Sequence, residues 1–395
     1  MKLLAKGARV DERTRERLLA HKLSKPLEQC LEVQDAIGSE LLKQVSEKLL
    51  DEQPLLRALC GRAKPHPVLA ALGSLPLPAQ LRMLLTLYAE LPSDRLEHSV
   101  TVALIAHGIS QKTLADAAGV ERVFLTAGLF HDVGELYIDP RVLKQTEHLA
   151  PEQWKHIVVH PVIGHRVLRD MAGAGPMVAE AVLHHHERRD GFGYPNHLAG
   201  DALPVRGEIL AAAEWLAGMM RASNWTLKGA GAGAKLIPGG FRQSILQAVA
   251  PAIAAASPQP REDAPDAADD LIVRLVRVSE TMDRYRDCRP WIESLIKAGT
   301  PASSVIAANL HRMEHIVRSV ASTGLAGEEP LALVARLNAI GDARIYQDLG
   351  NIVREIGWRL RELERDTLLR ATTLSPEQED VVKGMIARLK YGTNP

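Results

Sequence analysis

The sequence Phe130-His131-Asp132-Val133-Gly134 closes a strongly apolar run that begins at Val123. Such a run predicts a buried helix, and this one ends in two side chains that can bind a metal. A buried carboxylate without a partner destabilises the fold or shifts its pKa. A divalent cation removes this cost, because neutral imidazole and carboxylate are common metal ligands. The stretch therefore predicts a metal site.

Further histidines surround this stretch on both sides. His98 precedes it, and His160-Pro161 and the triple histidine His184-His185-His186 follow it. Asp94 lies four residues before His98, so both side chains belong to one face of a predicted helix. An isolated histidine in a helix is usually structural, but several of them around an acidic residue favour ligation. The pattern predicts a polyhistidine site that holds more than one ion.

The order and spacing of these motifs resemble the HD-GYP domains of the HD phosphohydrolase superfamily. The resemblance extends over roughly residues 90–256. It rests on motifs in the family's order, namely His98, His131-Asp132, His160-Pro161 with Gly164, His185-His186-Glu187-x-x-Asp190-Gly191-x-Gly193-Tyr194-Pro195, and Gly200-Asp201-Ala202-Leu203-Pro204.

The resemblance implies a ligand set for two divalent ions. The implied ligands are His98, His131, Asp132, His160, His185 and His186, with Glu214 where the family usually has aspartate and Asp94 as a candidate for a third ion. A hydroxide held between two ions can attack phosphorus in line. Histidine-rich ligation without thiolate favours iron or manganese, with zinc as an alternative.

Two departures from the family pattern bear on catalysis. Glu135 stands where the family usually has lysine, and residues 220–228 contain no match to its Arg-Pro-Tyr-Arg stretch. Glu135 reverses a charge that would face the substrate phosphate, so we expect slow turnover and faster turnover after Glu135→Lys. Substrate contacts are expected from Arg188, Arg189, Asp190, Gly193 and Tyr194.

The resemblance implies a phosphodiesterase that linearises cyclic di-GMP. A second interpretation is an HD phosphohydrolase that acts on another nucleotide or phosphoester. A third is a catalytically weak domain that binds a cyclic dinucleotide or a protein and signals through its flanking helices. The complete ligand set favours the first two, whereas Glu135 favours the third or a different substrate.

Composition places the chain among ordinary globular proteins. Its 395 residues suggest two or three domains, and its 48 basic residues equal its 48 acidic ones, so net charge gives no reason to expect nucleic-acid or membrane binding. Cys30, Cys60 and Cys288 form no metal or disulfide pattern and favour the cytoplasm. No apolar run reaches the about 18 residues of a membrane span, the start is too charged for a signal peptide, and no DNA-binding motif occurs.

The periodicity predicts an all-α chain in four parts. Residues 1–90 are a helical region with helices over 9–21, 27–50 and 77–91, and residues 91–256 are the metal-site domain. Within that domain we expect helices over 120–133, 178–187 and 204–220. The glycine-rich segment 229–235 is a flexible connector, since no hydroxyl residue follows its lysine as a phosphate loop requires.

The proline-rich, polar segment 257–270 predicts a linker, and residues 271–395 predict a helical bundle. One apolar stripe of that bundle contains Leu271, Leu275, Val278, Met282 and Tyr285. A bundle of this kind is suited to dimerisation, to regulation or to a protein partner, and the sequence leaves these open.

Overall fold

The computed structural model describes residues 7–21, 30–31, 33–61, 66–91, 94–114, 119–143, 150–171, 173–221, 240–256, 267–322, 330–340 and 343–389. Across these ranges every regular element is a helix, and the only β interaction is an isolated bridge between Asp190 and Ala199. The all-α prediction is confirmed. The glycine-rich segment 229–235 and residues 257–266 of the predicted linker lie outside the described residues.

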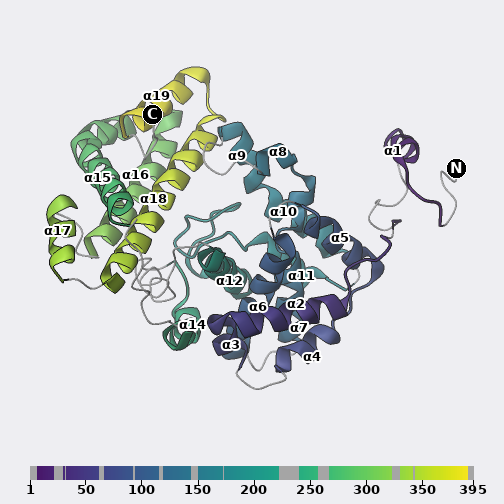
Figure 1. The fold of residues 1–395 in the computed structure, drawn as a ribbon. Coiled ribbons are helices and arrows are strands. Elements are labelled where there is room, and N and C mark those ends of the chain that lie inside the picture. Colours follow the sequence, from purple (N-terminus) through teal and green to yellow (C-terminus); the bar gives the residue numbers. More distant parts are fainter. Residues whose placement is uncertain are drawn as a thin grey trace.

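Two groups of helices follow one another along the chain (Figure 1). After α1 (Glu12–Leu19), the first group comprises α2 (Ser39–Glu52), α3 (Pro54–Cys60), α4 (Pro67–Gly73), α5 (Ala79–Ala89), α6 (Arg95–Thr113), α7 (Val120–Phe130), η2 (Val133–Tyr137), α8 (Pro140–Leu143), α9 (Pro151–Val158), α10 (His160–Arg169), α11 (Pro176–Leu183), η3 (Gly200–Ala202), α12 (Val205–Arg221) and α14 (Gln243–Ala256).

The first group packs around α6. Every residue of this helix from His98 to Ser110 is buried, as expected for a helix that is apolar on all sides. One continuous hydrophobic cluster extends from Ile37 to Ala256 and includes side chains of α2, α3, α4 and α5. The N-terminal helices therefore share their core with the helices that carry the predicted ligands.

The predicted helix over 27–50 begins only at Ser39. Gly38, its N-cap residue, has an extended backbone, and the Ile37 amide donates a hydrogen bond of 2.9 Å to Thr86 Oγ1. This tertiary contact with α5 holds residues 37–38 outside the helix, which a periodicity argument cannot detect.

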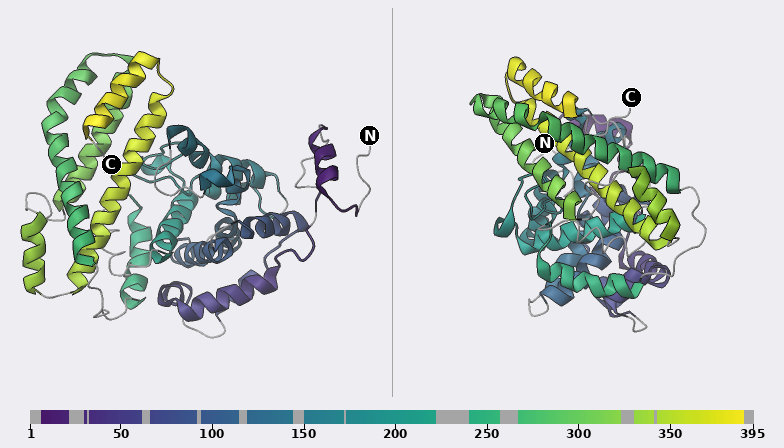
Figure 2. Two further views of the ribbon diagram at one scale, coloured as in Figure 1. Left: turned by 45° about the horizontal axis from the view of Figure 1, so that its top comes forward. Right: turned by 90° about the vertical axis from the view of Figure 1, so that its left-hand side faces the viewer.

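The second group is the predicted bundle. It contains α15 (Ala267–Lys297), α16 (Pro301–Ser322), α17 (Pro330–Ile340), α18 (Ala343–Ala371) and α19 (Pro376–Leu389). Its core runs from Leu271 to Leu389 and includes four residues of the predicted stripe, while Met282 packs against its edge. Figure 2 shows α15, α16 and α18 as long neighbouring helices. Helix α15 starts at Ala267, four positions before residue 271, where the bundle was predicted to begin.

The bundle lies against the loop that follows the triple histidine. Arg312 of α16 donates a hydrogen bond of 3.0 Å to the Phe192 carbonyl and pairs with Asp366 of α18 at 2.5 Å. The His315 ring contacts the Phe192 ring with centroids 5.1 Å apart. These contacts place α18 beside the predicted site. No helix in the described ranges is long and apolar enough to cross a membrane.

Candidate metal centre

The pair His131-Asp132 lies in the turn between α7 and η2. The predicted helix over 120–133 ends at Phe130, so both residues lie just beyond the last turn of α7. A Cβ atom on Gly134 would lie 2.0 Å from the His160 carbonyl oxygen. Only glycine permits this approach, which brings the start of α10 against η2.

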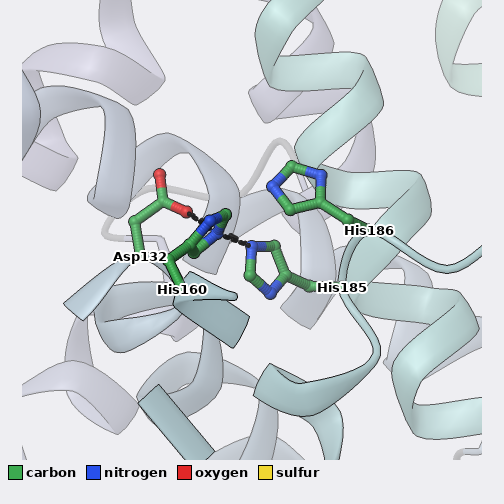
Figure 3. Close-up of side chains that lie close together, drawn as sticks. All are labelled: Asp132, His160, His185 and His186. Atoms are coloured by element: carbon green, nitrogen blue, oxygen red, sulfur yellow. Dashed lines mark hydrogen bonds and ion pairs between the residues drawn. The ribbon is translucent and has the colours of Figure 1, made fainter. Parts of the chain in front are cut away.

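The first group of potential ligands consists of Asp132, His160, His185 and His186, each with a ligand atom within 4.8 Å of the others (Figure 3). Asp132 Oδ1 lies 3.2 Å from Nε2 of both His160 and His185. Those two nitrogen atoms are 3.1 Å apart. The predicted helix over 178–187 ends at Leu183, so the histidines project from a turn rather than from successive helix positions.

The second group consists of His98, His131 and, again, Asp132. Asp132 Oδ2 lies 3.1 Å from His131 Nε2 and 4.0 Å from His98 Nε2. Glu214 of α12 places Oε2 3.1 Å from Nε2 of both histidines. The two oxygens of Asp132 thus face different groups, the arrangement required of a carboxylate that bridges two ions.

The imidazole rings are oriented by the backbone. Nδ1 of His131, His160 and His185 lies 2.8, 2.7 and 2.6 Å from the carbonyl oxygen of the residue three positions earlier. A carbonyl can only accept, so each Nδ1 carries the proton and each Nε2 presents a lone pair. Hydrogen bonds of this kind commonly orient histidine ligands of metals.

The arrangement of these lone pairs suits a bound cation. Two unprotonated Nε2 atoms cannot hydrogen-bond to each other across the 3.1 Å between His160 and His185. Within the described residues, His131 Nε2 and Glu214 Oε2 are buried without a hydrogen-bond partner. Nitrogen and carboxylate oxygen are ligands for divalent transition metals, so the donor set fits such ions.

Burial and charge set the protonation states. Burial by itself would raise the pKa of Asp132, but the His131 imidazole, with His160 and His185, holds it well below the usual range. The pKa of Glu214 is likewise held low by His98 and His131 against the effect of burial. Burial lowers the pKa of His185, which favours a neutral ligand. Asp132 raises the pKa of His131 and His160 against burial, so protons compete with metal there.

Two predicted residues stand apart from both groups. Asp94 is exposed at the start of α6 and belongs to neither group of potential ligands. Glu135 forms an ion pair of 2.7 Å with Arg95. Burial, with the nearby Asp132, raises the pKa of Glu135 to about 7. The Tyr88 hydroxyl lies 3.3 Å from Asp132 Oδ2 and 3.4 Å from Glu135 Oε2. Sequence reasoning missed Tyr88 and Arg95.

Three of the predicted substrate-binding residues organise the loop after the histidines. Arg189 donates hydrogen bonds to the Gly200 carbonyl and to Asp201 at 3.1 and 2.9 Å. Asp190 accepts a hydrogen bond of 3.0 Å from the Phe192 amide. A Cβ atom on Gly193 would lie 2.3 Å from the Arg188 nitrogen, so the loop can close only with glycine there.

Glu187 is a further loop residue to which the sequence assigned no role. Its buried carboxylate accepts hydrogen bonds from the amides of Asn196 and Leu198 at 2.5 and 3.0 Å. These bonds fold the loop back so that the Tyr194 ring stacks on His186 with a centroid distance of 4.6 Å. Through Tyr194, Glu187 thereby helps to orient the ring of His186, a member of the first ligand group.

A cavity of about 920 Å³ opens beside the centre, and His185, His186 and Glu214 form part of its wall. Of the predicted substrate-binding residues, Arg188 and Tyr194 line it. The opposite wall belongs to α15 and α18, which sequence reasoning did not place near the site. The available signal was the repeat of Arg354, Trp358, Arg361 and Arg365 on one face of a helix.

Comparison with known proteins agrees with this geometry. Residues 80–233 match the HD domain family. This segment, which carries both groups of potential ligands, is therefore an HD domain, and its motifs resemble those of HD-GYP domains.

Several relatives are cyclic dinucleotide phosphodiesterases by name. A cyclic di-GMP phosphodiesterase of Thermotoga maritima is 37% identical over 106 residues, which is 26% of this chain and 29% of the relative. The response regulator RpfG of Xanthomonas campestris, named as a cyclic di-GMP phosphodiesterase, is 28% identical over 35% of this chain and 36% of its own. A 3'3'-cGAMP-specific phosphodiesterase of Vibrio cholerae is 35% identical over 22% of this chain and 17% of its own. The matches thus span about a third or less of these relatives.

Proposed function

We propose that the protein is a metal-dependent phosphodiesterase that opens a cyclic dinucleotide, with cyclic di-GMP as the first candidate. The observation that carries the proposal is Asp132, whose two carboxylate oxygens each face a separate group of histidine nitrogens. In this proposal His98, His131 and Glu214 complete one ion site, and His160, His185 and His186 complete the other. We expect iron or manganese in both.

The bound ions would supply a hydroxide nucleophile and would neutralise charge on the phosphate oxygens. The protein's own part is to hold the ligands and to receive the substrate. Backbone carbonyls orient three of the histidines, and the hydroxyl of Tyr88 lies 3.3 Å from Asp132 Oδ2. The cavity beside His185 and His186 provides room for a nucleotide, with Arg188 at its wall.

The open alternatives differ in substrate or in activity. The 3'3'-cGAMP-specific relatives make that cyclic dinucleotide the second candidate substrate. Glu135 favours the alternative of a weakly active module, because it is an acidic residue at the family's lysine position. For such a module we propose a protein partner or a second copy of the chain, bound through the flanking helices. We propose a cytoplasmic location from the cysteine pattern.

The test is hydrolysis by protein purified anaerobically with added iron or manganese. Cyclic di-GMP, 3'3'-cGAMP and bis(p-nitrophenyl) phosphate are supplied in parallel. We expect turnover of at least one cyclic dinucleotide, and we expect Asp132→Asn to abolish it. The matched control is His156→Ala, which changes an exposed histidine outside both ligand groups. Metal-loaded protein that hydrolyses none of the three compounds would overturn the proposal.

A further inference from the structure

We propose that the C-terminal bundle forms half of the substrate site, with arginines of α15 and α18 binding the second phosphate of a cyclic dinucleotide while its first phosphate lies at the metal centre. This inference rests on the proposed function and names the residues that select a substrate with two phosphates.

The arginines belong to two helix faces that meet at the cavity. On α18, Arg354, Trp358, Arg361 and Arg365 follow one another at steps of four, three and four residues, which places them on one face. On α15, Arg274 and Arg277 are three residues apart and share a face in the same way. All six side chains line the cavity that His185, His186 and Glu214 also line.

Arg188 contributes a guanidinium group from the side of the cavity that carries His185 and His186. Its side chain is 8% exposed, and its Nε and Nη2 atoms have no hydrogen-bond partner within the described part of the chain. Arg188 forms an ion pair with Asp190, but the 3.7 Å between Nε and Oδ2 is beyond hydrogen-bond distance. Unmade hydrogen bonds on a buried guanidinium are costly, and a phosphate would satisfy them with charge-assisted bonds.

Arginines outnumber acidic residues among the side chains that line the cavity, six to four. Glu214 faces His98 and His131, and Glu187 accepts loop amides. Glu355 pairs with Arg359 at 2.9 Å. Glu362 is buried, and burial raises its pKa to about 7, which removes much of its negative charge near neutral pH. The lining of the cavity therefore has an excess of basic over acidic side chains.

The size and the aromatic lining also suit a dinucleotide. The cavity volume of about 920 Å³ is near the upper end of ordinary ligand pockets. Trp358 lies on the same face as the arginines and is 40% exposed. Trp154 lines the cavity from α9, and the Arg365 guanidinium lies 5.5 Å from the centre of its ring. Flat aromatic side chains are platforms on which bases stack regardless of sequence. A substrate with one phosphate and no base would use neither feature.

The decisive variant is Arg277→Ala/Arg361→Ala in the metal-loaded full-length chain. Both side chains are exposed at the cavity wall, so their removal leaves the cores intact. We expect KM for cyclic di-GMP to rise by about tenfold or more, since charge-assisted hydrogen bonds to phosphate are lost. Hydrolysis of bis(p-nitrophenyl) phosphate, which has no second phosphate, should keep its KM and kcat. The control is Arg286→Ala, an exposed arginine of α15 outside the cavity.

A binding measurement separates this inference from the proposed function. Phosphorothioate analogues of cyclic di-GMP and 3'3'-cGAMP, which resist hydrolysis, are titrated calorimetrically into the metal-loaded full-length chain, with and without the two arginine changes. Weaker binding by about tenfold in the arginine variant supports the inference even where turnover is absent. Equal affinities, or no binding of either compound, would overturn it. Loss of bis(p-nitrophenyl) phosphate hydrolysis in the wild-type chain would instead count against the proposed phosphodiesterase chemistry.

Discussion

The Arg95 guanidinium lies 2.7 Å from the Glu135 carboxylate, and both side chains are mostly buried, with 14% and 12% of their surface exposed. Arg95 also donates a hydrogen bond of 3.2 Å to the Tyr88 hydroxyl, which in turn lies 3.3 Å from Asp132. The acidic residue at this position therefore has a cationic partner that belongs to α6. Arg95 thus brings a guanidinium group from α6 to the neighbourhood of Asp132.

This pairing changes what Glu135→Lys should do. A lysine at position 135 would lie against Arg95, so we expect the variant to lose about 3 kcal/mol of unfolding free energy instead of gaining activity. Arg95→Met in the same chain should restore much of that loss by removing the like charge. Denaturant unfolding measures the effect, with Glu135→Gln as the uncharged comparison. Full stability of Glu135→Lys would show that the pair contributes nothing.

The number of bound metal ions should depend most strongly on Asp132, because this carboxylate faces both ligand groups. We expect about two ions per chain in the wild type, a loss of both in Asp132→Ala, and a loss of one in Glu214→Gln or in His186→Ala. The reason is that Asp132 faces both groups of nitrogens, whereas Glu214 and His186 each face one. Elemental analysis of anaerobically purified protein gives the ratios. Equal losses from all three variants would contradict two separable ion sites.

Stability should depend on pH through Glu362. Its folded pKa of about 7 lies above its ordinary value of 4.5 because the carboxyl is buried. As pH rises from 4.5 through 7, the unfolded chain releases this proton first, so the unfolding free energy falls by up to about 3 kcal/mol. Glu362→Gln should remove that part of the fall. Denaturant midpoints between pH 4.5 and 8 measure it, with the exposed Glu280→Gln as the control. Parallel pH curves for wild type and Glu362→Gln would refute the prediction.

We also propose that the chain consists of two domains, with the boundary between its two hydrophobic cores. The first hydrophobic cluster ends at Ala256 and the second begins at Leu271. A protease of broad specificity should therefore cut first within the proline-rich segment 257–266. A fragment of residues 267–395 should remain helical by circular dichroism, because its apolar side chains bury one another. A first cut between residues 94 and 214 would contradict this division.

The sequence alone determined the types of ligand and the helical character of the chain. Imidazole and carboxylate at His131-Asp132 and at His185-His186 are chemical facts of the sequence, and apolar periodicity reflects the local geometry of a helix. It did not determine where the ligand helices end. Helix α11 stops at Leu183 because Glu187 and Gly193 fold the next residues into a loop, and those contacts join residues five to eleven positions apart, which helical periodicity does not predict.

Only the tertiary structure decided which residues share a site. It brings the carboxylate of Asp132 between two sets of histidines, pairs Glu135 with Arg95, and leaves Asp94 exposed outside both ligand groups. It also sets α18 across the cavity from His186. Spacing along a helix predicts which side chains share a face, but the distance between two helices depends on how their buried surfaces pack. That packing depends on the whole core and cannot be predicted from any single motif.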